Sequence, residues 1–306
     1  MRAFFTSILF TILFLPCQAQ STDLKPNLEK GKEYKQITNS KVTIIQDLNG
    51  QQINMVMAIK GAMTFLVKSV NANDYNMEVK FEQLSMSMQM PQGTMEFSSE
   101  KNDENDIFST ILGAMKNKTF DVLMSKTGKI VEVRNVELLW ETAINQFDQL
   151  PEMQKEQLKA QIVKSYGAKA LKGNIEMVTA IYPDSPVNIG EKWTINTNIE
   201  SGMSSKMTTI YELTDLTPNF ALIKGNSTIE TADKEAYIES NGMPIKYDLK
   251  GTMSSEIKVD KNTGWIVEAT INQEIKGDTY IKENPKMPNG MKIPMTMKSE
   301  MVITNN

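Results

Sequence analysis

Alternation of apolar and polar residues recurs along most of the chain and predicts β-strands. Asn49-Gly50 separates two such runs and is the strongest short signal for a two-residue hairpin turn. With that turn, Ile44 faces Met55 and Val42 faces Met57, so the apolar side chains of both strands share one face. An antiparallel meander is the expected assembly of these strands.

Between two β-rich stretches the apolar period lengthens to about 3.6 residues, which predicts amphipathic helices. One helix is expected over residues 136–150. A second is expected from Pro151, with later breaks at Gly173 and Pro183. A shorter helix is expected over about residues 104–116. Each helix has a single apolar face and should therefore pack against a sheet.

Short motifs recur in the same order in the two β-rich stretches. Residues 31–34 (GKEY) are echoed by residues 190–193 (GEKW), and residues 127–133 (TGKIVEV) by residues 263–269 (TGWIVEA). The two echoes are separated by similar distances along the chain. This spacing predicts two related β units.

The expected fold class is α+β, mainly β, with two related antiparallel β units that form curved sheets and amphipathic helices packed on them. Whether the units share one sheet or form two remains open at this point. The predicted organisation is a signal peptide at 1–19, a first β unit at 20–134, a helical segment at 135–183 and a second β unit at 184–306.

The amino terminus has the three parts of an export signal: a positive start, an apolar run that ends at Leu15, and the small residue Ala19 at the cleavage position. The run is shorter than the roughly twenty apolar residues that a membrane-spanning helix needs. Acylation at Cys17 is the alternative, but Pro16 stands where a lipoprotein signal has a small residue. We therefore expect an exported, soluble protein, periplasmic or extracellular, without a lipid anchor.

The composition is poor in the residue types that act most readily as catalytic bases and nucleophiles. The chain has no histidine, and its single cysteine lies in the export signal. The net charge of −4 is spread without long blocks of one sign, so a nucleic-acid partner is not expected. We expect no catalytic residue, cofactor or metal. A glycosidase that uses only carboxylates is the enzymatic alternative, although nothing in the sequence singles out a pair.

Residues 186–193 (PVNIGEKW) resemble the P-V-x-x-G-x-x-W signature of uncharacterised secreted proteins from Bacteroidetes. That family has no established activity, so the resemblance supplies no site residue. The expected architecture is also similar to the periplasmic lipoprotein carriers and related lipid-binding folds, in which helices cover the concave face of a curved sheet. This second likeness implies a lipid-binding fold and does not by itself settle function.

Methionine is unusually frequent, with 22 residues, and five of them alternate along two predicted strands. On a strand this spacing points the side chains to one face. An adaptable core face is the first interpretation, a cavity for a lipid or other hydrophobic ligand the second, and a thioether site for copper(I) the third. The absence of histidine weakens the copper interpretation. The five candidate ligand-binding residues are Met86, Met88, Met90, Met295 and Met297.

We therefore expect an exported, non-enzymatic protein that binds a lipid or other hydrophobic ligand between its helices and a curved sheet. The alternative is an envelope structural or protein-interaction module without a small-molecule ligand. A broad exposed apolar patch over a solid core would distinguish that alternative.

Overall fold

The computed structural model describes residues 21–306 apart from residues 102, 104, 105, 146, 148, 149, 202, 241, 242, 285 and 286. The predicted signal peptide at 1–19 lies outside the described residues. The described part is mainly β, with 13 strands in one antiparallel sheet. No helix within it combines the length and apolar character needed to cross a membrane.

The elements follow one another along the chain with these bounds: β1 (Glu33–Leu48), β2 (Gln51–Val70), β3 (Asp74–Met90), β4 (Gly93–Ser98), α1 (Ile107–Met115), β5 (Thr119–Ser125), β6 (Ile130–Arg134), the 3-10 helix η1 (Glu137–Leu139), α2 (Glu141–Asn145), α3 (Glu152–Tyr166), α4 (Ala168–Thr179), β7 (Lys192–Ser201), β8 (Met203–Leu216), β9 (Phe220–Thr231), β10 (Ile238–Ser240), β11 (Met243–Asp260), β12 (Ile266–Ile281) and β13 (Met291–Thr304).

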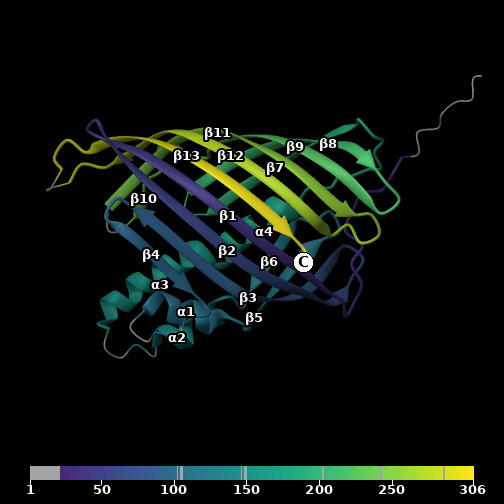
Figure 1. Ribbon diagram of the computed structural model, residues 1–306, viewed down its shortest axis with the longest axis horizontal. Coiled ribbons are helices and arrows are strands. Elements are labelled where there is room, and N and C mark those ends of the chain that lie inside the picture. The colour runs from purple at the N-terminus through teal and green to yellow at the C-terminus, as the bar shows by residue number, and fades with distance from the viewer. Residues whose placement is uncertain are drawn as a thin grey trace, which may run out of the picture.

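All strands belong to one curved sheet (Figure 1). The order across it is β6-β5-β3-β2-β1-β13-β12-β11-β9-β8-β7, while β4 pairs with β3 and β10 with β11. The carboxy-terminal strand β13 lies between β1 and β12 and hydrogen-bonds to both. The two β units therefore share one sheet, which answers the question that the sequence left open.

The predicted hairpin between β1 and β2 is confirmed. Asn49 and Gly50 have φ angles of 56° and 86°, as both central positions of this turn require. Ile44 pairs with Met55 and Val42 with Met57, in the expected register. The face that carries these four side chains is called the inner face below.

The repeat seen in the sequence recurs in the backbone hydrogen bonds. The amide of Gly31 donates to the carbonyl of Val67 at 2.8 Å, and the amide of Gly190 donates to the carbonyl of Leu213 at 2.7 Å. Strands β1, β2, β3, β5 and β6 correspond in order and pairing to β7, β8, β9, β11 and β12. The two units thus lie side by side in the same sense, with β13 between them.

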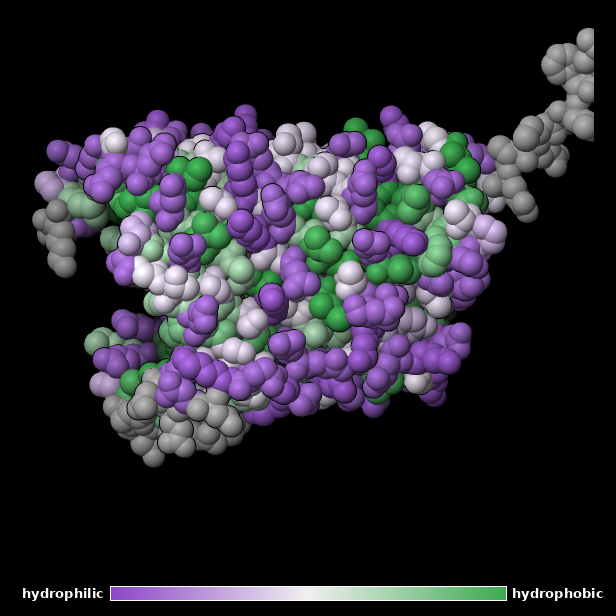
Figure 2. Space-filling view, viewed as in Figure 1, coloured by the Kyte–Doolittle hydropathy of each residue, from purple (hydrophilic) through white to green (hydrophobic). Residues whose placement is uncertain are grey.

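The inner face is mainly apolar and the outer face is mainly polar. Inner side chains of β2, β3 and β5 form a first buried cluster with residues of α1, α2 and α3. Inner side chains of β7, β8, β9, β11, β12 and β13 form a second cluster with the end of α4 and the segment after it. The outer face carries ion pairs such as Lys224 to Glu256 at 2.9 Å, and polar side chains are interspersed there with smaller apolar patches (Figure 2).

Two details of the helical prediction were wrong. The helix predicted over residues 136–150 is not continuous. Its described part contains the two short helices η1 and α2, because Trp140 leaves helical geometry at φ −124° while its ring is fully buried. The break between the later helices falls at Gly167, whereas Gly173 lies buried inside α4. Tertiary packing there outweighs the low helix propensity of glycine. The helix start at Pro151 is confirmed.

Helix α4 lies between the two edge strands of the sheet and packs against both β6 and β7 (Figure 1). The Glu176 carboxylate accepts the amide hydrogen of Ile130 on β6 at 3.1 Å. On the other side, the Trp193 indole of β7 donates to the carbonyl of Ile181, just after the helix, at 2.9 Å. At β6, a side chain of α4 thus satisfies a backbone group of the sheet edge. At β7, a side chain of the edge strand bonds to the backbone just after α4. The helix thereby covers both edges, where strand pairing ends.

Candidate functional site

The candidate site is a methionine-rich part of the inner face. We call it the methionine face and define it as the inner side chains of β1 to β4 and β13 near the β1–β2 and β3–β4 hairpins. Its members are Val42, Ile44, Ile53, Met55, Met57, Ile59, Met86, Met88, Met90, Met95, Met295, Met297 and Met301.

The strand register connects the five methionines that the sequence proposed. Met297 on β13 pairs with Ile44 on β1, and Ile44 pairs with Met55 on β2. Met88 on β3 pairs with Met57 on β2. Directly paired residues of antiparallel strands point to the same face, so these side chains form one continuous surface across four strands. The two methionine strands β3 and β13 are thus parts of one surface, separated by β1 and β2.

Burial distinguishes this surface from the two cores. Met295, Met297 and Met301 are partly buried against the second cluster. Met86 and Met88 are also partly buried, yet in the described part of the chain they belong to neither cluster. The methionine face therefore includes an apolar region that the protein's own side chains cover incompletely.

The methionine face carries no charge. Its side chains are all aliphatic or thioether, and inner positions paired beside it add polar but uncharged groups, as with Ser299, which pairs with Val42 on β1 and with Gln273 on β12. Charged residues alternate with them and point outward, as Lys298 does between Met297 and Ser299. An uncharged and partly open apolar surface suits the hydrocarbon part of a ligand.

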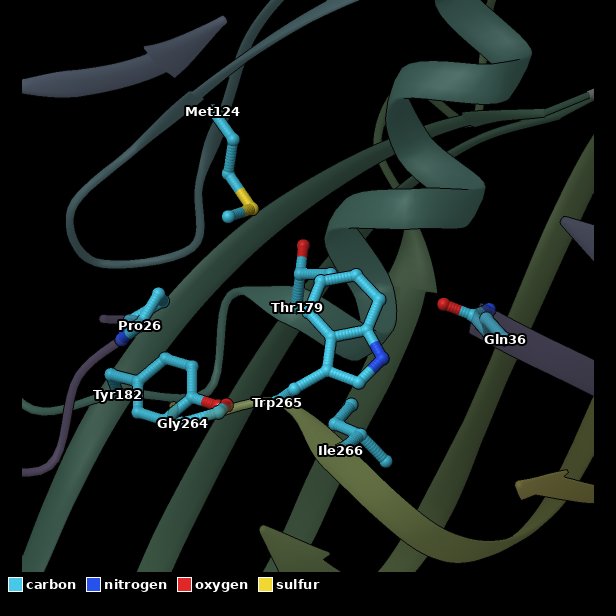
Figure 3. A pocket seen from close by; sticks show the side chains of 8 residues that line it. All are labelled: Pro26, Gln36, Met124, Thr179, Tyr182, Gly264, Trp265 and Ile266. Atoms are coloured by element: carbon cyan, nitrogen blue, oxygen red, sulfur yellow. The ribbon is translucent and has the colours of Figure 1, made fainter. Parts of the chain in front are cut away.

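One enclosed pocket lies where the two β units meet, and it is only about 10 Å³ (Figure 3). Such a volume holds at most one water molecule. Eight side chains from distant segments line it: Pro26, Gln36, Met124, Thr179, Tyr182, Gly264, Trp265 and Ile266.

Polar atoms around this pocket are used in structural hydrogen bonds. The Trp265 indole donates to the carbonyl of Lys35 at 2.8 Å, and Thr179 Oγ1 donates to the carbonyl of Gly128 at 2.7 Å. The Tyr182 hydroxyl donates to the carbonyl of Gly264. Burial raises the pKa of that hydroxyl. The pocket is therefore a packed junction, since its donors already have acceptors.

A groove of about 560 Å³ lies between α1 and α3. Lys101 and Asp106 line it at the start of α1, where Asp106 caps the helix by accepting the Ser109 amide hydrogen at 3.1 Å. Burial raises the pKa of the Asp106 carboxyl, but hydrogen bonds from Lys101 and Ser109 outweigh it and hold the pKa below its usual range. Asp106 therefore stays ionised, as expected of a helix start.

Some members of the methionine face were not proposed as site residues from the sequence. Met57 was placed on the apolar face of the first hairpin without a role in binding. Met95 was missed because β4 is a six-residue strand, and the alternation of Met95 and Phe97 after the Gly93 turn is its only signal. In the structure Met88 pairs with both Met57 and Met95.

Residues 72–266 match the sequence profile of DUF6263, a family of unknown function. The chain belongs to this family. The DUF6263 match runs from the start of β3 to the start of β12, so it includes Met86, Met88 and Met90 but not Met295 or Met297. No curated protein sequence matches the chain significantly.

Solved structures resemble this DUF6263 chain only remotely. A lipovitellin structure concerned with lipid–protein interactions has a TM-score of 0.49 and 11% identity, and it covers 92% of this chain. The chain spans only 25% of that lipovitellin chain. A DUF1329 protein from Desulfovibrio piger has a TM-score of 0.17 and 7% identity, covering 90% of this chain and 87% of its own.

A putative outer membrane lipoprotein-sorting protein domain from Vibrio parahaemolyticus has a TM-score of 0.13 and 7% identity, covering 88% of this chain and 84% of its own. At these scores none of the three structures supports an argument about function. The function of this DUF6263 chain must therefore be argued from its own surfaces.

Proposed function

We propose that the protein is an exported, non-enzymatic binding protein whose methionine face holds a lipid or another hydrophobic molecule. The observation that carries the proposal is the incomplete cover of Met86 and Met88, which are partly buried but lie outside both cores. A purely structural inner face would instead be closed, as it is around Phe65 and Val79 at the other end of β2 and β3.

Residue type supports the same proposal. Methionine is unbranched and flexible, so a surface rich in it can repack around acyl chains of different shape. Polar side chains on the outer face keep such a protein soluble while the apolar ligand lies inside the curve of the sheet. Figure 2 also shows a notch at the left of the molecule, between the strand ends and the part of the molecule below them.

The first experiment is native mass spectrometry of the protein purified from its own cell envelope, followed by organic extraction of anything released. We expect an adduct that extracts as a lipid of defined mass. The delipidated protein should then take up a fluorescent fatty acid with a saturable isotherm. A clean apo mass together with no saturable uptake would refute the proposal.

Substitution locates the site. We expect Met86→Gln combined with Met88→Gln to weaken fatty-acid uptake by about tenfold or more, because desolvating an unpaired amide costs about 1–3 kcal/mol and 1.4 kcal/mol corresponds to tenfold. Met153→Gln is the matched control, since Met153 lies on α3 with 71% of its surface exposed. Equal uptake by both variants would exclude the methionine face as the site.

The alternative is an envelope interaction module without a small ligand. Such a module would require a broad exposed apolar patch. The exposed large apolar residues of the described chain are instead spread over many elements. Only α3 has two of them, Met153 and Val163. Among enzymes, a carboxylate-only glycosidase remains the competitor. In the groove beside α1, Asp106 does not suit the general-acid role of such an enzyme, because hydrogen bonds from Lys101 and Ser109 hold the pKa of its carboxyl below the usual range.

A further inference from the structure

We propose that Met57, Met88 and Met95 form a thioether site for a soft monovalent cation, copper(I). The inference goes beyond ligand binding, because the site needs sulfur whereas an apolar ligand needs only an apolar surface. It uses a row of three methionines on three neighbouring strands.

Register places the three side chains in line. Met88 on β3 pairs directly with Met57 on β2 and with Met95 on β4, so all three point to the inner face. Adjacent strands lie about 4.8 Å apart, which puts the outer two residues about 10 Å from each other with Met88 midway. Each sulfur lies beyond its Cβ on a flexible chain. The outer thioethers can therefore lean inward and meet an ion above Met88.

The ligand chemistry selects the ion. Thioether sulfur is a soft, neutral ligand that favours copper(I), whereas magnesium and calcium prefer oxygen. No histidine occurs in the chain, and among the described residues no group of three or more aspartates, glutamates or cysteines is placed to hold a metal ion. A metal site at this row would therefore have to be built from thioether sulfur.

Access also fits a metal site. Met95 is 41% exposed on β4, and β4 pairs with no strand other than β3 in the described part of the chain. An ion can approach from that open side without crossing a packed core. Exposure to water further lowers the cost of placing a positive charge among neutral ligands. Leucine would keep this surface apolar, but it would supply no ligand for the ion.

The test is a titration of the full chain with copper(I), kept reduced by ascorbate, against the chelator bathocuproine disulfonate. The wild type should withhold one equivalent of copper(I). A triple variant with Met57→Leu, Met88→Leu and Met95→Leu should bind at least tenfold more weakly. These are volume-conserving substitutions, so the far-ultraviolet circular dichroism should not change.

The control variant combines Met295→Leu and Met297→Leu, which lie on the same face outside the row, and it should bind copper(I) as the wild type does. Affinity should be the same at pH 5.5 and pH 8, because thioethers do not titrate, unlike histidine or cysteine ligands. A sulfur-only first shell in X-ray absorption would support the site. Unchanged binding by the triple variant, or no binding by the wild type, would overturn it.

Fatty-acid uptake separates this inference from the proposed function. Copper(I) binding without any fatty-acid uptake in the wild type would refute the proposed function and leave the thioether site standing. Fatty-acid uptake without copper(I) binding in the wild type would refute the thioether site and support the proposed function.

Discussion

Alanine at Gly128 should destabilise the fold far more than alanine at Gly190, although both glycines have nearly the same backbone angle. Their φ angles are 80° and 87°. A Cβ added at Gly190 meets no atom within 4 Å, whereas one added at Gly128 would stand 1.9 Å from the carbonyl oxygen of Thr179 at the end of α4. Comparing the two alanine variants therefore separates the cost of the positive φ angle from the cost of the steric clash.

The magnitudes follow from the contacts. The left-handed angle costs an alanine about 1–2 kcal/mol at either position. At Gly128 the end of α4 must also move, which breaks the 2.7 Å hydrogen bond from Thr179, worth about 0.5–1.5 kcal/mol, and overpacks the junction at about 1–3 kcal/mol. We expect losses in the free energy of unfolding of about 1–2 kcal/mol for Gly190→Ala and about 3–5 kcal/mol for Gly128→Ala.

Urea unfolding followed by circular dichroism and tryptophan fluorescence measures both variants. Coincident transitions from the two probes would justify a two-state analysis. Equal losses for the two variants would refute the reasoning, because they would mean that the turn at Gly128 does not press against the end of α4.

Three further predictions concern stability. Burial raises the pKa of Tyr211 to about 12, so its stabilising contribution is complete below the unfolded value of about 10 and is lost as the pH rises through 12. Tyr211→Phe should flatten the fall in unfolding free energy over that range. Trp265→Ala should cost about 3–5 kcal/mol in urea unfolding, since its ring packs against two aromatic rings of the first unit, and a loss below 1 kcal/mol would contradict that packing. Lys224→Ala should leave the midpoint of urea unfolding unchanged within error despite the 2.9 Å ion pair with Glu256, because the pair is exposed, and a measurable loss would show that it is not screened.

Local patterns were sufficient to predict the first hairpin and the shared face of its side chains. The Asn49-Gly50 turn fixes the register of β1 and β2 through the requirements of its own backbone. The one-residue alternation of Met86, Met88 and Met90 likewise fixed their common face. Both signals depend only on residues close in the sequence, which is why they could be read without the fold.

Long-range pairing could not be predicted in the same way. Nothing near Met297 indicates that β13 pairs with β1, some 250 residues earlier, so the continuity of the methionine face was not foreseen. The prediction of one continuous helix over residues 136–150 was wrong because burial of Trp140 in the first cluster outweighs the local periodicity. The predicted helix break at Gly173 was wrong for a related reason, because Gly173 lies at a buried position inside α4.

The position of α4 between β6 and β7 determines how the molecule can change its internal width. Every other neighbour around the sheet is joined by backbone ladders, which shift only in steps of whole residues. Between β6 and β7, side-chain hydrogen bonds and packing of α4 take the place of a ladder, and these contacts can adjust continuously as a helix tilts or slides. The distance between β6 and β7 can therefore change at α4 while every strand-to-strand hydrogen bond stays intact.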